Sequence, residues 1–197
     1  MTVSRQLWVL AGGNGAGKST FYNLFLAPTG IKLVNADIIA KIIEPENPES
    51  ASYAAANVAE QIRKELLQQG VSFCFETVFS HPSKIDFIAQ ARVQGYKVIL
   101  VYIHLNTSEL NQARVYQRVT EGGHSVPADK IHSRIPRTMR HIGAVLPLVN
   151  EARLLDNSYR DNPFQQVACV RRGIRQWIID PLPHWTEEIL KGIPSLK

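Results

Sequence analysis

The sequence predicts an α/β fold: a doubly wound parallel sheet of about five strands, with a helical insertion and a C-terminal β-hairpin. Apolar segments of strand length alternate with helical segments along most of the chain, as in βαβ units. The links between them are short, which favours right-handed crossovers and a parallel sheet. A glycine-rich loop follows the first strand, at the edge where such sheets bind phosphate. At 197 residues the chain suits one domain, 1–197.

Composition places the chain among globular proteins, and its basic charge indicates either an ordinary solvated surface or a site for anionic ligands. Hydrophobic residues make up 45% of it and charged residues 20%, and the net charge of +5 suits phosphorylated partners. Cys74 and Cys169 lie in apolar segments without metal-ligand spacing, so we expect free thiols in a reducing compartment. Neither a secretory signal nor an apolar run of membrane-spanning length is present. We therefore expect a cytoplasmic protein without membrane contact.

The first half of the chain supplies most of the expected sheet. Its expected elements are strand 7–11, helix 18–26, strand 31–37, helix 38–43, helix 50–69, strand 71–75, helix 82–94 and strand 96–103. Proline and glycine mark the ends of the helices, as Gly70 does for helix 50–69. The apolar face predicted for that helix consists of Ala55, Val58, Ala59, Ile62 and Leu66.

The segment 106–148 is predicted to be a helical, basic insertion that closes over the phosphates as a lid. Arg114 and Arg118 are four residues apart and share a helix face, an arrangement that an anion between them would stabilise. Further basic residues lie between 134 and 140, and Pro136 should kink or interrupt their helix. The remaining chain predicts strand 154–158, a hairpin of strands 164–170 and 174–179, and helix 181–190.

The loop after the first strand carries the pattern Gly-x-x-x-x-Gly-Lys-Ser of a phosphate-binding loop. Its backbone N–H groups can turn inward on phosphate oxygens at the positive end of the following helix. Lys18 supplies a charge to the β- and γ-phosphates, and the Ser19 hydroxyl is the expected Mg²⁺ ligand. The cofactors expected are therefore ATP or GTP with Mg²⁺. The expected nucleotide-binding residues are Gly12, Gly13, Asn14, Gly15, Ala16, Gly17, Lys18, Ser19 and Thr20.

Two carboxylates follow strands at the same edge of the predicted sheet. Asp37 is placed to accept a proton from a hydroxyl that attacks the γ-phosphate, and its alternative role is the N-cap of helix 38–43. Glu76 follows an apolar run, where many nucleotide hydrolases carry an aspartate. It can orient waters on Mg²⁺, contact the acceptor together with Thr77, or cap the next turn.

Several motifs together resemble the zeta-toxin family of P-loop kinases. They are the loop 11–20, Asn35-Ala36-Asp37, Phe75-Glu76-Thr77, Gly95-Tyr96-Lys97-Val98, the segment 118–127 with its Gly-Gly-His sequence, and Asp156-Asn157-Ser158. They occur in order between residues 7 and 178. The resemblance implies a P-loop kinase fold of the nucleoside-monophosphate-kinase kind. It also implies phosphorylation of a sugar hydroxyl, as on UDP-N-acetylglucosamine, and inhibition by an antitoxin, which we expect to be a separate protein.

The resemblance also implies roles for single residues. Asp37 resembles the catalytic base, Lys18 the loop lysine and Glu76 an acid on the substrate side. Arg118 resembles one arginine that neutralises the transferring phosphate, and the second is Arg134 or Arg137, of which we favour Arg134. Departures from the family are Val78, where a threonine is common, and Pro136, which makes the second arginine harder to assign.

The sequence leaves several functions open. A small-molecule kinase could act on a nucleotide sugar or on an unrelated alcohol such as an antibiotic or a nucleoside. A P-loop NTPase that binds nucleic acid is the alternative, favoured only by the net charge, because no basic groove with interleaved aromatic residues is visible. A transporter-type ATPase is excluded by the absence of a Leu-Ser-Gly-Gly signature. No role is assigned to His124.

Overall fold

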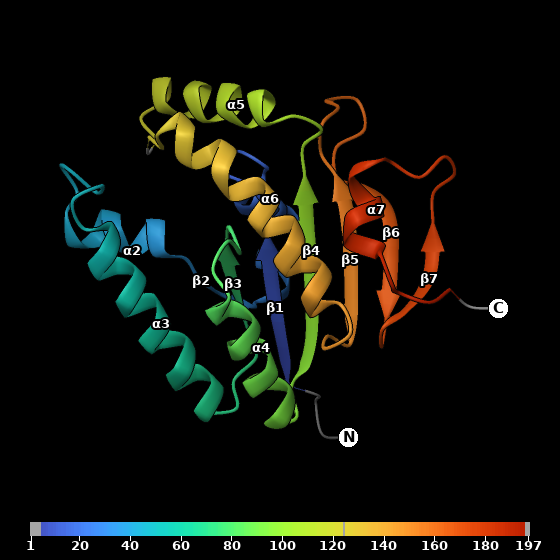
Figure 1. The fold of residues 1–197 in the computed structure, drawn as a ribbon. Coiled ribbons are helices and arrows are strands. Elements are labelled where there is room, and N and C mark those ends of the chain that lie inside the picture. Colours follow the sequence, from blue (N-terminus) through green and yellow to red (C-terminus); the bar gives the residue numbers. More distant parts are fainter. Residues whose placement is uncertain (1–4, 124, 196–197) are drawn as a thin grey trace.

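The computed structural model describes residues 5–123 and 125–195, so His124 lies outside the described residues. One mixed sheet of seven strands runs through the molecule in the order β2-β3-β1-β4-β5-β6-β7 (Figure 1). The first five strands of this order are parallel and the last two pair antiparallel. The strands are β1 (Gln6–Ala11), β2 (Lys32–Val34), β3 (Phe73–Thr77), β4 (Lys97–His104), β5 (Glu151–Asp156), β6 (Gln165–Arg171) and β7 (Ile174–Ile178).

Helices cover both faces of the sheet. Alternate residues of β1 point to opposite faces, and Leu7 and Val9 join one core cluster while Leu10 joins the other. The first cluster includes side chains of α3, α4, α6 and α7, and the second those of α1 and its continuation. The helices are α1 (Lys18–Phe21), α2 (Ala36–Ile43), α3 (Ser52–Gln68), α4 (Ser83–Val93), α5 (Ser108–Thr120), α6 (Ala128–Val145) and α7 (Trp185–Leu190). A π-helical segment, Tyr22–Leu26, and a 3₁₀ turn, Ala27–Thr29, continue α1.

The predicted sheet of about five parallel strands is too small, because the C-terminal hairpin belongs to the same sheet. β6 pairs with β5 along its length, from Glu151 opposite Arg171 to Asp156 opposite Gln165. Arg172 and Gly173 connect β6 and β7, with φ angles of 51° and 72°. A two-residue turn with positive φ at both positions matches the twist of an antiparallel pair. Because β6 and β7 pair antiparallel at the edge of the parallel strands, the sheet is mixed.

Two expectations about the helices are wrong in part. α6 runs uninterrupted through Pro136. This proline is exposed, so water can reach the carbonyl that loses its hydrogen-bond partner. In α3, the buried row is Ala55, Ala59, Arg63 and Leu67, whereas Val58 is 37% exposed. The predicted apolar face of α3 therefore packs toward the core at Ala55, Ala59, Ile62 and Leu66 but not at Val58, and it missed the buried Arg63.

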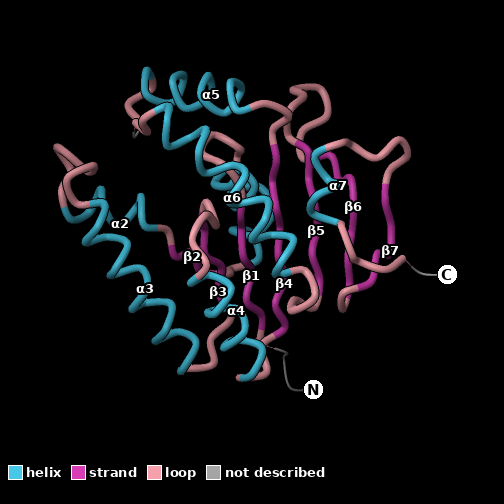
Figure 2. Tube along the Cα trace, in the orientation of Figure 1, coloured by secondary structure: helices cyan, strands magenta, loops and turns pink. Residues whose placement is uncertain are grey.

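The predicted lid segment divides into two parts. α5 and the first half of α6 lie beyond the carboxyl ends of the strands, where the connecting loops gather (Figure 2). The last turns of α6 instead bury Ile142 and Val145 in the core cluster against the sheet. Within the described part of the chain, no helix has both the length and the apolar character that a membrane span needs.

Candidate active site

The phosphate-binding loop connects β1 to α1 and can adopt its path only with glycine at key positions. Gly12 has φ 151°, and a Cβ there would collide with the backbone carbonyl of Ile103. Gly17, with φ 98°, is the N-cap of α1 in the left-handed region. The loop therefore follows a path that directs backbone N–H groups toward the start of α1, as phosphate binding requires.

Other elements hold this loop from outside. The side-chain amide of Asn111 in α5 donates to the Asn14 carbonyl at 2.7 Å, and that of Asn157 donates to the Ala16 carbonyl at 2.9 Å. Asn111 and Asn157 are both buried. Asn111 was not identified as a site residue, because only the folded chain brings α5 against the loop.

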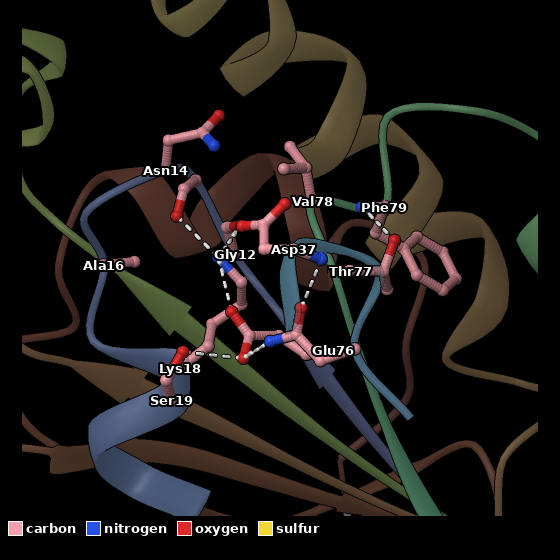
Figure 3. A network of polar contacts seen from close by, with 12 residues as sticks. Gly12, Asn14, Ala16, Lys18, Ser19, Asp37, Glu76, Thr77, Val78 and Phe79 are labelled. Atoms are coloured by element: carbon pink, nitrogen blue, oxygen red, sulfur yellow. Dashed lines mark hydrogen bonds and ion pairs between the residues drawn. The ribbon is translucent and has the colours of Figure 1, made fainter. Parts of the chain in front are cut away.

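Lys18 is buried beneath the loop, with 7% of the residue exposed. Its Nζ donates to the carbonyls of Gly12 at 3.0 Å and Gly13 at 2.9 Å, and lies 3.8 Å from Oε1 of Glu76 (Figure 3). Burial lowers the pKa of the Lys18 ammonium, and the carboxylates of Glu76 and Asp37 oppose this shift. A positive charge is thus held at the base of the loop, next to two carboxylates.

Glu76, the fourth residue of β3, connects three parts of the site. Its Oε2 accepts hydrogen bonds from the Ser19 hydroxyl and from the Asn35 side-chain amide, each at 2.8 Å (Figure 3). Since β3 is the neighbour of β1, the strand pairing brings Glu76 beside a loop that lies 57 residues earlier in the sequence. The capping role considered for Glu76 is therefore not the one it has, because its carboxylate binds side chains of the phosphate loop and of the β2–α2 link.

Asp37 lies in the first turn of α2 rather than at the end of a strand. The N-cap of α2 is Asn35, whose Oδ1 accepts from the backbone N–H of Asp37 at 2.7 Å and that of Ile38 at 3.4 Å. The alternative that Asp37 caps this helix is therefore wrong. Its exposed side chain lines the same cavity as Lys18 and Glu76. Asn35 was missed as a site residue, although an asparagine just before a helical run is a recognisable capping signal.

Three arginines of α5 and α6 line this cavity: Arg114, Arg118 and Arg134. Arg114 donates to the Asn157 carbonyl at 2.8 Å, and Arg134 reaches Oδ1 of Asn14 at 3.5 Å. Arg137 instead donates to the Ser133 carbonyl one turn earlier in α6 at 3.1 Å, and it is not among the cavity-lining residues. Of the two arginines left open by the sequence, Arg134 is the one beside the phosphate loop.

Thr77 and the loop after it form another wall of the cavity. The Thr77 hydroxyl accepts from the backbone N–H of Phe79, which has φ 64° and is buried. α6 fastens this loop from the other side: the Thr138 hydroxyl donates to the Val78 carbonyl at 2.8 Å, and Nδ1 of His141 lies 3.1 Å from the Phe79 carbonyl. A left-handed conformation is costly for phenylalanine and persists here because three side chains hold the loop.

The cavity has a volume of about 680 Å³ and is rich in cations. It collects six of the nine expected nucleotide-binding residues, and Asp37, Glu76, Thr77, Arg118 and Arg134 line it as well. The three loop residues outside its lining, Gly12, Gly13 and Ala16, contribute backbone carbonyls that bind Lys18 and Asn157. Three residues that the sequence did not single out, Arg63, His81 and Lys84, extend the lining toward α3 and α4.

The chain is similar to known proteins in sequence and in fold. The family model described as Zeta toxin matches residues 4–178. A protein of Haemophilus influenzae described as uncharacterized is 33% identical over 139 residues, which cover 67% of this chain and 99% of that protein.

Two solved structures have the same fold. A chain of the AvrRxo1-ORF1:ORF2 complex crystallised with ATP superposes with a TM-score of 0.72 at 20% identity, covering 98% of this chain and 64% of that one. A chain of the PezAT toxin-antitoxin system of Streptococcus pneumoniae superposes with a TM-score of 0.64 at 16% identity, covering 86% and 72%. The chain thus spans less than two thirds of the AvrRxo1 chain that it matches.

Proposed function

Since the chain belongs to the zeta toxin family, we propose that it is a kinase that transfers the γ-phosphate of ATP or GTP to a hydroxyl of a small molecule. The observation that carries this proposal is the convergence of Lys18, Ser19, Asp37 and Glu76 on one cavity. A hydrolase needs to position only water beside the phosphate. The free volume next to Asp37 instead leaves room for an acceptor molecule.

The nucleotide would bind with its phosphates over the phosphate loop, Lys18 facing the β- and γ-phosphates. Ser19 and Glu76 offer a hydroxyl and a carboxylate 2.8 Å apart, the oxygen ligands that suit Mg²⁺ when phosphates and waters complete its shell. This fits the described residues, among which no group of three His, Cys, Asp or Glu forms a dedicated metal cage. The ATP complex of the structurally similar AvrRxo1 supports a nucleotide here.

Asp37 would act as the general base. Its carboxylate takes the proton of the acceptor hydroxyl as the oxygen attacks the γ-phosphorus, and the bond to the β-phosphate oxygen breaks. Arg118 and Arg134 would neutralise the charge on the transferring group, since both line the cavity from the lid segment. Glu76 is better suited to the metal side than to the acceptor, because its Oε2 already binds Ser19.

UDP-N-acetylglucosamine and other nucleotide sugars are the acceptors that we propose to test first. A separate antitoxin protein is the partner that we propose, in line with the toxin-antitoxin system to which PezAT belongs. Because the reaction consumes ATP or GTP, we expect it to occur in the cytoplasm. Nucleic-acid binding is less well supported, because the basic side chains discussed above line a cavity instead of an exposed groove.

The decisive experiment is incubation with γ-labelled ATP, Mg²⁺ and a panel of nucleotide sugars, sugars and nucleosides. We expect label in a panel compound with the parent protein and a strong loss with Asp37→Asn. ATP hydrolysis without labelling of any acceptor would contradict the proposal. Tight, salt-dependent binding of single-stranded RNA under the same conditions would favour the nucleic-acid alternative instead.

A further inference from the structure

The α3–α4 side of the cavity contains a buried arginine in an unusual position. Arg63 lies in the middle of α3, in the row of residues that is otherwise formed by Ala55, Ala59 and Leu67. Only 6% of Arg63 is exposed. Its guanidinium carbon lies 5.2 Å from the centre of the Phe75 ring and 5.7 Å from that of Phe87. A charged side chain therefore occupies a core position, at the wall of the cavity.

The protein itself does little to compensate this charge. Within the described ranges, the buried Nε of Arg63 has no hydrogen-bond partner and no carboxylate forms an ion pair with its guanidinium. Glu60, one turn earlier, is the carboxylate that acts on Arg63 electrostatically, and it forms its ion pair with Lys64 at 2.7 Å. Two aromatic faces attract the guanidinium but accept no conventional hydrogen bond from it. A buried guanidinium without a carboxylate partner is costly, and because Arg63 lines the cavity, an anion bound there would compensate its charge.

A second cation and a further donor lie at the same wall. Lys84, in the first turn of α4, is partly buried, and its pKa is lowered by burial and by the nearby charge of Arg63. Nδ1 of His81 accepts from the backbone N–H of Ser83 at 3.2 Å, so the ring hydrogen of the neutral imidazole is on Nε2. Like charges held close together are unfavourable unless an anion lies between them. The three side chains line the same cavity as the phosphate loop.

We propose that Arg63, Lys84 and His81 bind an anionic group of the acceptor, so that the hydroxyl acceptor is a phosphorylated or carboxylated molecule and not an uncharged alcohol. This rests on the proposed kinase function and narrows its substrate class. The nucleotide donor would occupy the phosphate loop, and the anionic group of the acceptor would lie against α3 and α4. Arg63 provides a fork of N–H donors that matches phosphate or carboxylate oxygens.

The first test measures binding without any assumption about the acceptor. Protein saturated with Mg²⁺ and the non-hydrolysable analogue AMP-PNP is titrated with inorganic pyrophosphate and, separately, with malonate, by calorimetry. We expect one further anion site, with the tighter probe showing whether phosphate or carboxylate is preferred. Arg63→Met keeps the length and the apolar contacts and should weaken that binding about tenfold or more, since a charged hydrogen bond is lost. AMP-PNP affinity should change less than about twofold.

Lys41→Met is the matched control, because Lys41 is exposed on α2 and lies outside the lining of the cavity. It removes the same charge and should leave pyrophosphate binding unchanged. If Arg63→Met does not fold, Lys84→Met replaces it, with the same expected loss. Equal anion affinity in parent and variant, or no second anion site in the parent, would overturn the inference.

The second test separates this inference from the kinase proposal. In the labelling assay, UDP-N-acetylglucosamine is compared with free N-acetylglucosamine, and each labelled acceptor is then compared between parent and Arg63→Met. We expect both proteins to label only charged acceptors. Relative to the parent, Arg63→Met should raise the KM for such an acceptor about tenfold and keep kcat within about threefold. Equal labelling of an uncharged alcohol by both proteins would refute the anion site while leaving the kinase intact. If Arg63→Met loses pyrophosphate binding but the parent protein labels no acceptor, the anion site is supported and the kinase proposal is refuted.

Discussion

The phosphate-loop side and the α3–α4 side of the cavity differ in how their polar side chains are bonded. On the first side, Asn111 and Asn157 donate to loop carbonyls, and Ser19 donates to Glu76 at 2.8 Å. On the second side, within the described residues, the Nε of Arg63 has no partner, and Lys84 donates only a long bond of 3.4 Å to its neighbour Ser83.

The phosphate-loop side is therefore the preformed half of the site, whose shape is fixed before binding, and the α3–α4 side is the half whose polar groups are completed by the ligand. A loop fixed by buried amides keeps its shape whether or not phosphate is bound, which reduces the cost of ordering on binding. Arg63 and Lys84, which form no ion pair with a carboxylate among the described residues, keep part of their interaction energy for the ligand. We therefore expect changes on the loop side to act mainly on kcat and changes on the α3–α4 side mainly on KM.

The largest effect should come from Lys18, at the centre of the preformed half. Lys18→Ala removes the charge that we expect to face the β- and γ-phosphates, so turnover should fall by orders of magnitude. Circular dichroism and thermal melting serve as controls for the fold. A folded variant with the parental rate of transfer would show that the loop does not hold the reacting phosphates.

Asp37 provides the next test, because it lines the cavity that the two halves share. Asp37→Asn keeps the shape but loses the basicity, so kcat should fall by roughly 10²–10⁴ while nucleotide affinity stays within a few fold. Asn35 caps α2, so the helix should keep its stability in this variant. Glu76→Gln is the comparison, and part of its defect should appear in Mg²⁺ dependence. An unchanged rate of transfer in Asp37→Asn would leave Glu76 as the remaining base.

The lid segment, 106–148, should show an intermediate effect on amide hydrogen exchange when nucleotide binds. Binding of AMP-PNP should draw Arg118 and Arg134 toward the phosphates, so amide exchange across 108–134 should slow about tenfold. The amides of 139–145 should change little, because Ile142 and Val145 are already buried in the core. Hydrogen exchange followed by mass spectrometry measures both. Equal slowing along the whole of α6 would mean that the helix has no fixed part.

Asn35 should give the smallest effect. Asn35→Ala removes the N-cap of α2 and one donor to Glu76, so the free energy of unfolding should fall by about 1 kcal/mol. Asn35→Asp is the informative partner, since it keeps the capping oxygen but places a second negative charge beside Glu76. Urea unfolding should show nearly parental stability for Asn35→Asp together with altered Mg²⁺ dependence. Equal loss of stability in both variants would mean that the cap contributes nothing.

The part of the site that depends on local sequence could be predicted. The spacing from Gly12 to Ser19 specifies the loop by itself, because strand, glycines and helix start are consecutive. The carboxyl-end rule for parallel strands also brought Glu76 to the same edge. The contact between Ser19 and Glu76 could not be predicted, because it depends on β3 pairing directly beside β1.

The missed features depend on long-range packing or on small rotations. The fully buried row of α3 continues from Ala59 through Arg63 and Leu67, one residue beyond the predicted Ile62 and Leu66, and helical periodicity does not resolve such a difference. The hairpin was predicted from its turn, but its pairing with β5 depends on which edge of the sheet is free. Arg63 itself left a signal in the sequence, because it lies four residues after Ala59 and four before Leu67, in a row of apolar residues.

The hydrogen bonds from α6 to the loop after Thr77 connect that loop to the helix that carries Arg134. The first half of α6 carries Arg134, which lines the cavity beside the phosphate loop. Further along α6, Thr138 donates to the Val78 carbonyl and His141 contacts the Phe79 carbonyl. We expect that a movement of α6 on nucleotide binding also shifts this loop, and with it His81 at the wall of the cavity. By thermodynamic reciprocity, the acceptor should then raise nucleotide affinity by the same factor by which the nucleotide raises that of the acceptor. Paired calorimetric titrations, each ligand with and without the other, would measure this factor.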